Sequence, residues 1–114
     1  MAKWCIYGKL ESEAYKGMIA NPHNRREQAG ALLQGIGLNI SAYYLSSGPD
    51  FDFLITAEGP DNLDRNTLLA GYMVPMSSGS FKELNIVEIF TAEEGEEAMK
   101  AAQSMVSGYR PPAG

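Results

Sequence analysis

The sequence has one cysteine and one histidine, Cys5 and His23. A single cysteine excludes an internal disulfide and a cysteine-based metal cluster. A structural zinc site would need about four nitrogen or sulfur ligands. We therefore expect no metal site and no cofactor. No base lies next to Cys5 in the sequence, so we expect it to be buried as a small hydrophobic side chain rather than to act as a nucleophile.

Basic clusters and long apolar runs are also missing. The net charge is −5, and the only pair of adjacent basic residues is Arg25-Arg26. Nucleic acids and anionic membrane surfaces bind clustered Lys and Arg, so the composition predicts neither as a partner. No apolar run reaches the roughly 18 residues of a membrane span, and Met1 leads directly into a strand-like segment. These features predict a soluble cytoplasmic protein.

Several catalytic signatures do not occur. The sequence has no Gly-x-Gly-x-x-Gly, no phosphate-binding loop and no Gly-x-Ser-x-Gly. Nucleotide binding and serine-hydrolase chemistry therefore receive no support from motifs.

The composition that is present suits one globular domain. The chain has 114 residues, of which 45% are hydrophobic, a length near the commonest domain size. We predict a single domain over 1–107. The Gly- and Pro-rich end, 108–114, is predicted to be a flexible tail.

Hydrophobic periodicity predicts alternating strands and helices. Strands are expected over 3–10, 39–47, 51–58 and 81–90. Helices are expected from about 11 to the break at Pro22, from about His23 to the glycines at 35 and 37, from a cap at Asp61 to Pro75, and from a Thr91/Glu94 capping box onward.

This order predicts an α+β fold of the ferredoxin-like βαββαβ type, an antiparallel sheet with helices on one face plus a C-terminal helix. In the third strand, Phe53, Ile55 and Ala57 should face the helices, while Leu54 and Thr56 face the other way. Large apolar groups then occupy both faces of the sheet, although helices cover only one. We therefore expect self-association through the open face, sheet against sheet, as a homodimer or a higher oligomer.

Four stretches of sequence carry a family resemblance. "GPDFDFLITAEGPD" is similar to a Gly-x-Tyr-Asp turn followed by an apolar strand that exits through Glu-Ala-Pro-Asp. "NPHNRREQAGALLQGIGLNI" followed by "SAYYL" is similar to a Ser-Pro-basic segment, an Ala-rich helix, a glycine pair and a strand that ends in Phe-Tyr. "EIFTAEE" is similar to a closing Ala-Phe-Thr-x-Glu-Glu. In this order the chain resembles the GYD-domain proteins, which are small bacterial and archaeal proteins related in fold to the dimeric α+β barrels.

The resemblance extends from about Tyr7 to Glu97 and implies the same fold and oligomerisation, with little about activity. The chain departs from the pattern at two points. Phe51 replaces the family tyrosine, and one extra residue separates Gly48 from Phe51-Asp52. No role of that tyrosine hydroxyl is therefore carried over.

Asp52 is the leading candidate for a catalytic group. A carboxylate facing a cavity between the sheet and a partner would suit acid-base work. The competing interpretation is structural: the carboxylate accepts hydrogen bonds from turn amides and anchors the hairpin. We expect the structural role first, and an exposed position at the rim for Asp50.

Further candidates are a catalytic His23 and a ligand-binding group of Tyr7, Tyr43, Leu54 and Arg25. Each has a plainer interpretation, as a solvated residue at a helix start for His23 and Arg25, and as strand packing for the others. Three functions remain open. The first is an oligomer that binds a small molecule between the sheet and a neighbouring subunit. The second is a cofactor-independent monooxygenase- or isomerase-like enzyme, and the third is a purely structural assembly protein.

Overall fold

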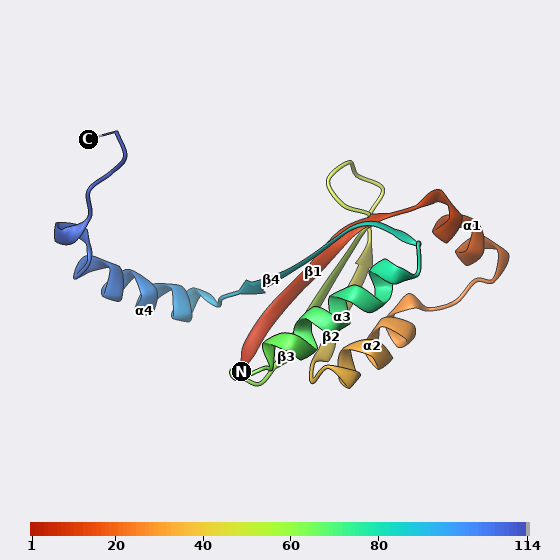
Figure 1. The fold of residues 1–114 in the computed structure, drawn as a ribbon, viewed down its shortest axis with the longest axis horizontal. Helices are drawn as coiled ribbons and strands as arrows, with labels where there is room; N and C mark the ends of the chain where they lie inside the picture. The colour runs from red at the N-terminus through yellow and green to blue at the C-terminus, as the bar shows by residue number, and fades with distance from the viewer. Residues whose placement is uncertain (114) are drawn as a thin grey trace.

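Four antiparallel strands form one sheet in the order β2-β3-β1-β4 (Figure 1). The computed structural model describes residues 1–113. The elements are β1 (Ala2–Leu10), α1 (Ser12–Ala20), α2 (Arg25–Gly35), β2 (Asn39–Leu45), β3 (Phe53–Gly59), α3 (Arg65–Ser77), β4 (Phe81–Ile89), α4 (Ala92–Gln103) and a short 3-10 turn (Val106–Gly108). This order and pairing confirm the predicted α+β, ferredoxin-like arrangement.

The strand register confirms the predicted division between the two faces. On β1, Ile6 pairs with Ile55 and Tyr7 pairs with Leu54. Because alternate residues of a strand point to opposite faces, Ile6 and Ile55 share one face while Tyr7 and Leu54 share the other. Figure 1 shows α1, α2 and α3 on the same side of the sheet.

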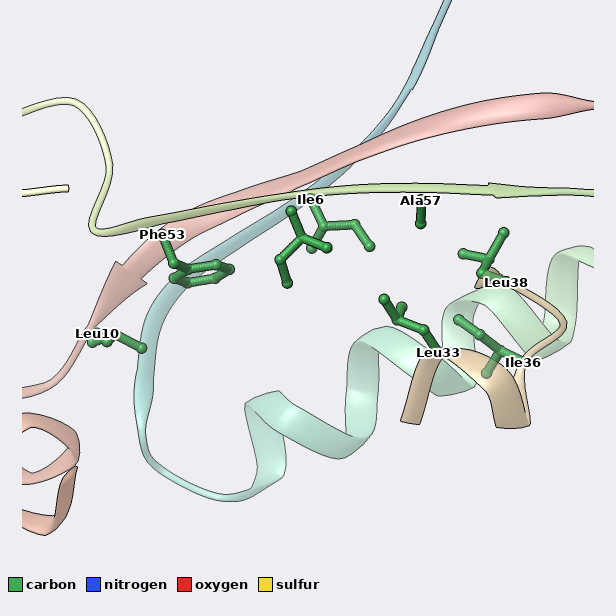
Figure 2. Close-up of a cluster of buried hydrophobic side chains, with 8 residues drawn as sticks. Ile6, Leu10, Leu33, Ile36, Leu38, Phe53 and Ala57 are labelled. Atoms are coloured by element: carbon green, nitrogen blue, oxygen red, sulfur yellow. The ribbon is translucent and has the colours of Figure 1, made fainter. Parts of the chain in front are cut away.

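The hydrophobic core lies between this sheet face and the helices. Phe53, Ile6 and Ala57 project from the strands towards Leu33 of α2 and towards Ile36, which directly follows α2 (Figure 2). All of these side chains are buried. The Phe53 ring also makes an edge contact with Phe81, with ring centroids 5.5 Å apart. α2 therefore contributes to the core, and it ends at Gly35, where the glycines predicted its end.

Gly37 allows the chain to turn from α2 into β2. Its φ is +92°, a value that side chains other than glycine rarely adopt. The turn places the next residue, Leu38, in the core with 1% of its surface exposed. A short glycine-based stop thus positions a buried residue at the start of β2.

The predicted cap and end of α3 are both wrong by a few residues. Asp64, not Asp61, caps the helix, since its carboxylate accepts from Thr67 N at 3.0 Å and from Thr67 Oγ1 at 2.8 Å. Asp61 pairs with the N-terminal ammonium group instead, at 3.3 Å. Pro75 lies inside the helix, which continues to Ser77. Pro75 has no backbone N–H, so it donates no helical hydrogen bond to the carbonyl of Gly71, and the helix continues for only two more residues.

The β2–β3 hairpin is shorter than predicted. β2 ends at Leu45 and β3 begins at Phe53, so Phe51 and Asp52 precede the strand. A connection of this length leaves the turn exposed, and Asp50 lies on its surface as expected.

The capping box of α4 is confirmed, but the position of α4 is unlike that of the other helices. Thr91 Oγ1 accepts from Glu94 N at 3.1 Å, while Glu94 Oε1 accepts from Thr91 N at 2.9 Å. α4 projects away from the sheet and from α1–α3 (Figure 1), and gives the molecule its long dimension of 58 Å. No helix within residues 1–113 has the length and apolar character of a membrane span. Of the predicted tail, Gly114 lies outside the described residues.

Candidate functional site

A cavity of about 540 Å³ lies between the helix-covered face of the sheet and α1, α2 and α3. Its apolar wall comes from core residues of the strands and of α2, among them Ile6, Phe53, Leu33 and Ile36 (Figure 2). Small side chains, such as Ala29 of α2, leave the space open. The volume falls within the range of about 300 to 1,000 Å³ that is usual for small-molecule sites.

Three polar side chains form a cluster on the wall of this cavity: His23, Arg25 and Tyr43. His23 Nε2 lies 3.3 Å from an Arg25 guanidinium nitrogen, and its Nδ1 lies 2.7 Å from the carbonyl oxygen of Asn21. A guanidinium only donates, so His23 Nε2 accepts from Arg25 and Nδ1 donates to Asn21. The histidine thus orients the arginine at the cavity wall.

Tyr43 projects from β2 into the same region. Its ring stacks on Phe53, with centroids 6.4 Å apart. Burial raises the pKa of Tyr43, and the nearby Arg25 opposes that rise by favouring the phenolate. The phenol therefore remains protonated at neutral pH and can donate or accept a hydrogen bond at the cavity wall.

The positive charge of Arg25 has no carboxylate within ion-pair distance in the described part of the chain. Glu13 also lines the cavity, but it pairs with Lys16 at 3.1 Å. A half-buried guanidinium without an acidic partner is suited to an anionic or carbonyl group of a ligand.

Asp52 occupies a structural position outside the residues that line this cavity. Its carboxylate accepts from Leu10 N at 2.8 Å, and its backbone N–H donates to Gly8 O at 2.7 Å. The carbonyl of Asp52 accepts from Ser46 N at 2.9 Å, which closes the hairpin. The expected anchor is therefore present, but its side-chain donor is the end of β1 rather than a turn amide. The reason is that β3 starts only at Phe53, so the carboxylate replaces the strand carbonyl that Leu10 would otherwise meet.

Tyr15 of α1 lies close enough to Asp52 to be affected by it. Burial and the Asp52 carboxylate together raise the pKa of Tyr15. Both side chains belong to the end of the sheet where β1 passes into α1, and neither is among the residues that line the cavity.

The predicted ligand-binding residues divide between the two faces of the sheet. Arg25 and Tyr43 line the cavity, together with the predicted catalytic residue His23. Tyr7 and Leu54 lie opposite each other on the open face. The four predicted ligand-binding residues thus do not form one pocket within a chain, because neighbouring strand positions point to opposite sides.

The open face also carries the single cysteine. Cys5 pairs with Thr56 of β3 and Val87 of β4, near the middle of the sheet. It is half-buried, and burial raises the pKa of its thiol, which disfavours the reactive thiolate at neutral pH. Cys5 is therefore less buried than expected, although the raised pKa of its thiol is in keeping with a side chain that is not a nucleophile.

Other residues that line the cavity went unnoticed as site residues in the sequence. Met18 of α1, Gln28 of α2 and Val74 of α3 all contribute to the wall. For Met18 the signal that could have found it is helical periodicity, since it lies on the apolar stripe of α1 that packs against the core.

A metal centre has no support in the geometry. Within residues 1–113, no cluster of three or more His, Cys, Asp or Glu side chains is arranged to hold an ion.

A second, shallower groove of about 420 Å³ lies between α2 and α3. Ile36, Ala70 and Val74 are among the residues that line it. It contains no charged side chain. Its polar side chains, Asn66 and Thr67, are uncharged, so it lacks a charged group such as Arg25 of the first cavity.

No family model and no curated protein matches this chain.

Proposed function

We propose that this protein binds a small, mostly apolar molecule with an acidic or carbonyl end in the cavity between its sheet and α1–α3. The observation that carries the proposal is Arg25, which has no acidic partner within residues 1–113 and lies at the wall of a mostly apolar cavity. This site replaces the open face as the proposed location of the ligand.

The shape and lining of the cavity support a ligand of this class. Apolar walls with a few oriented polar groups are typical of small-molecule sites. Leu33 and Phe53 would contact the apolar part of the ligand, while Arg25 and Tyr43 would bind its polar end. His23 would hold the arginine in place rather than contact the ligand itself.

Two probes with the same hydrocarbon chain test the ligand class. Decanoate and decanol differ only in the end group, and isothermal titration calorimetry measures both affinities. We expect decanoate to bind about tenfold more tightly, because a hydrogen bond to a charged group contributes about 1.5 kcal/mol or more.

Arg25→Gln should remove the preference for decanoate and leave the affinity for decanol unchanged. Arg26→Gln is the matched control, since Arg26 is exposed and does not line the cavity. Ala29→Phe should fill the space and abolish binding of both probes. The proposal fails if neither probe binds the parent protein, or if the preference for decanoate survives Arg25→Gln.

Two broader assignments accompany this proposal. Membership of the GYD-domain family is proposed on the motifs of the sequence, and the order of strands and helices is compatible with it. A homo-oligomer is proposed because large apolar side chains, including Tyr44 and Val87, remain exposed on the open face. The enzyme alternative has no comparable support, since Asp52 does not line the cavity.

A further inference from the structure

α4 has an apolar stripe that no other part of residues 1–113 covers. Ala98, Met99 and Ala102 fall on one side of the helix at helical spacing, and Met105 and Val106 continue the stripe. Met99 is 70% exposed and Val106 is 69% exposed. The opposite side carries Glu93, Glu96, Glu97 and Lys100, with Lys100 paired to Glu97 at 3.0 Å. The helix is thus built to lie on an apolar surface with its charged side in water.

The open face of the sheet is a second uncovered apolar surface of the same chain. Cys5, Tyr7, Leu54 and Val87 lie side by side across β3, β1 and β4. None of them is fully buried. Helices pack stably on such sheet faces, as α1–α3 do on the other side.

α4 is held away from the sheet of its own chain. β4 remains paired with β1 up to Ile89, and α4 begins at Ala92, so only Phe90 and Thr91 connect them. Two residues are at the lower limit of the roughly two to six that usually join a strand to a helix packed against its sheet. Thr91 is extended, with ψ at 164°, and is held so by the capping box. In the structure α4 projects away from the sheet and from α1–α3 (Figure 1).

We infer that α4 covers the open sheet face of a second copy of this chain, and that the exchange is mutual. In a two-fold pair each copy would supply one helix and one sheet, so both uncovered surfaces would be buried at once and the assembly would close. Contact of sheet against sheet, the expectation from the sequence, would leave the stripe of α4 exposed.

Cys5 makes the inference testable, because it is the only cysteine and lies on the open face. In a Met99→Cys variant of the full chain, copper-phenanthroline oxidation at micromolar concentration should give a disulfide-linked dimer. Peptide mass mapping should join Cys5 to position 99. Lys100→Cys, which alters the acidic side one position along, is the matched control and should stay unlinked, as should Met99→Cys combined with Cys5→Ala.

Three outcomes would overturn the inference. A Cys5–Cys5 link in the parent protein, with position 99 unreactive, would place sheet against sheet. A link from Cys5 to position 99 within a monomer would place α4 on its own sheet. A mass of 12.4 kDa for the parent protein in light scattering would exclude a second copy altogether. None of these measurements depends on ligand binding, so the inference can fail while the proposed ligand site stands.

Discussion

At the scale of single residues, Asp52 joins the end of β1 to the connection between β2 and β3. Its carboxylate holds Leu10 N at 2.8 Å, and its backbone binds Gly8 O and Ser46 N. The backbone contacts do not depend on the side chain, so the contribution of the carboxylate can be isolated by substitution.

Asp52→Ala should lower the free energy of unfolding by about 1.5 to 3 kcal/mol, because it leaves the half-buried Leu10 amide without an acceptor. Asp52→Asn keeps one acceptor oxygen and should cost about 1 kcal/mol. Urea unfolding measures both values, with Asp50→Ala in the exposed turn as the control. Equal losses for the two Asp52 variants would show that hydrogen-bond acceptance is not what the residue contributes.

The burial of Tyr43 predicts that the stability of the fold depends on pH in the alkaline range. Burial raises its pKa above the ordinary value of 10.0. Above pH 10 the unfolded chain therefore loses the phenolic proton while the folded chain keeps it, and stability falls as the pH rises.

Tyr43→Phe should show a shallower loss of stability above pH 10 than the parent protein, as measured by thermal unfolding over a series of pH values. Arg25→Gln should raise the pKa of Tyr43 further, since it removes the neighbouring cation. Identical alkaline profiles for the parent and Tyr43→Phe would mean that the phenol is not shielded from water.

At the scale of elements, two glycines differ sharply in their surroundings. A Cβ added at Gly8 of β1 would meet the backbone carbonyl of Glu83 in β4, and backbone cannot move aside as a side chain can. A Cβ added at Gly17 of α1 would meet nothing within 4 Å.

Gly8→Ala should therefore separate β4 from β1 and lower stability by several kcal/mol. Gly17→Ala should raise stability by about 0.5 to 1 kcal/mol, because glycine is the poorer helix former. Chemical denaturation of the two variants gives the comparison. A mild effect of Gly8→Ala would indicate that the β1–β4 pairing tolerates more separation than its register implies.

At the scale of the whole molecule, the uncovered sheet face and the projecting α4 predict an assembly. A standard interface buries roughly 800 Å² on each partner, and each chain would offer two apolar surfaces. Light scattering at micromolar concentration should report at least twice the chain mass of 12.4 kDa.

Leu54→Arg should reduce the measured mass to that of the monomer, because it places an unpaired charge in the proposed interface. Leu69→Arg is the control, since Leu69 is also an exposed leucine, at 54%, but lies on α3. If Leu69→Arg dissociates the assembly and Leu54→Arg does not, the helix face is the interface.

Much of the fold could be predicted from local patterns. The alternation of Phe53, Ile55 and Ala57 with Leu54 and Thr56 predicted the two faces of β3 correctly. The capping box at Thr91 and the glycine stop after α2 were also confirmed. These features depend on neighbours within a few residues, so the sequence by itself determined them.

Tertiary structure decided the partners of side chains that are distant in sequence. The acceptor role of Asp52 was predicted, but its donor, Leu10 N, lies 42 positions away. The cavity depends on how closely three helices approach the sheet, and this approach brings His23 and Arg25 to Tyr43. The outward direction of α4 likewise follows from where β4 leaves the sheet. Periodicity shows that a segment has an apolar side, but only the packed chain determines which surface that side meets, because burial is a property of the whole arrangement.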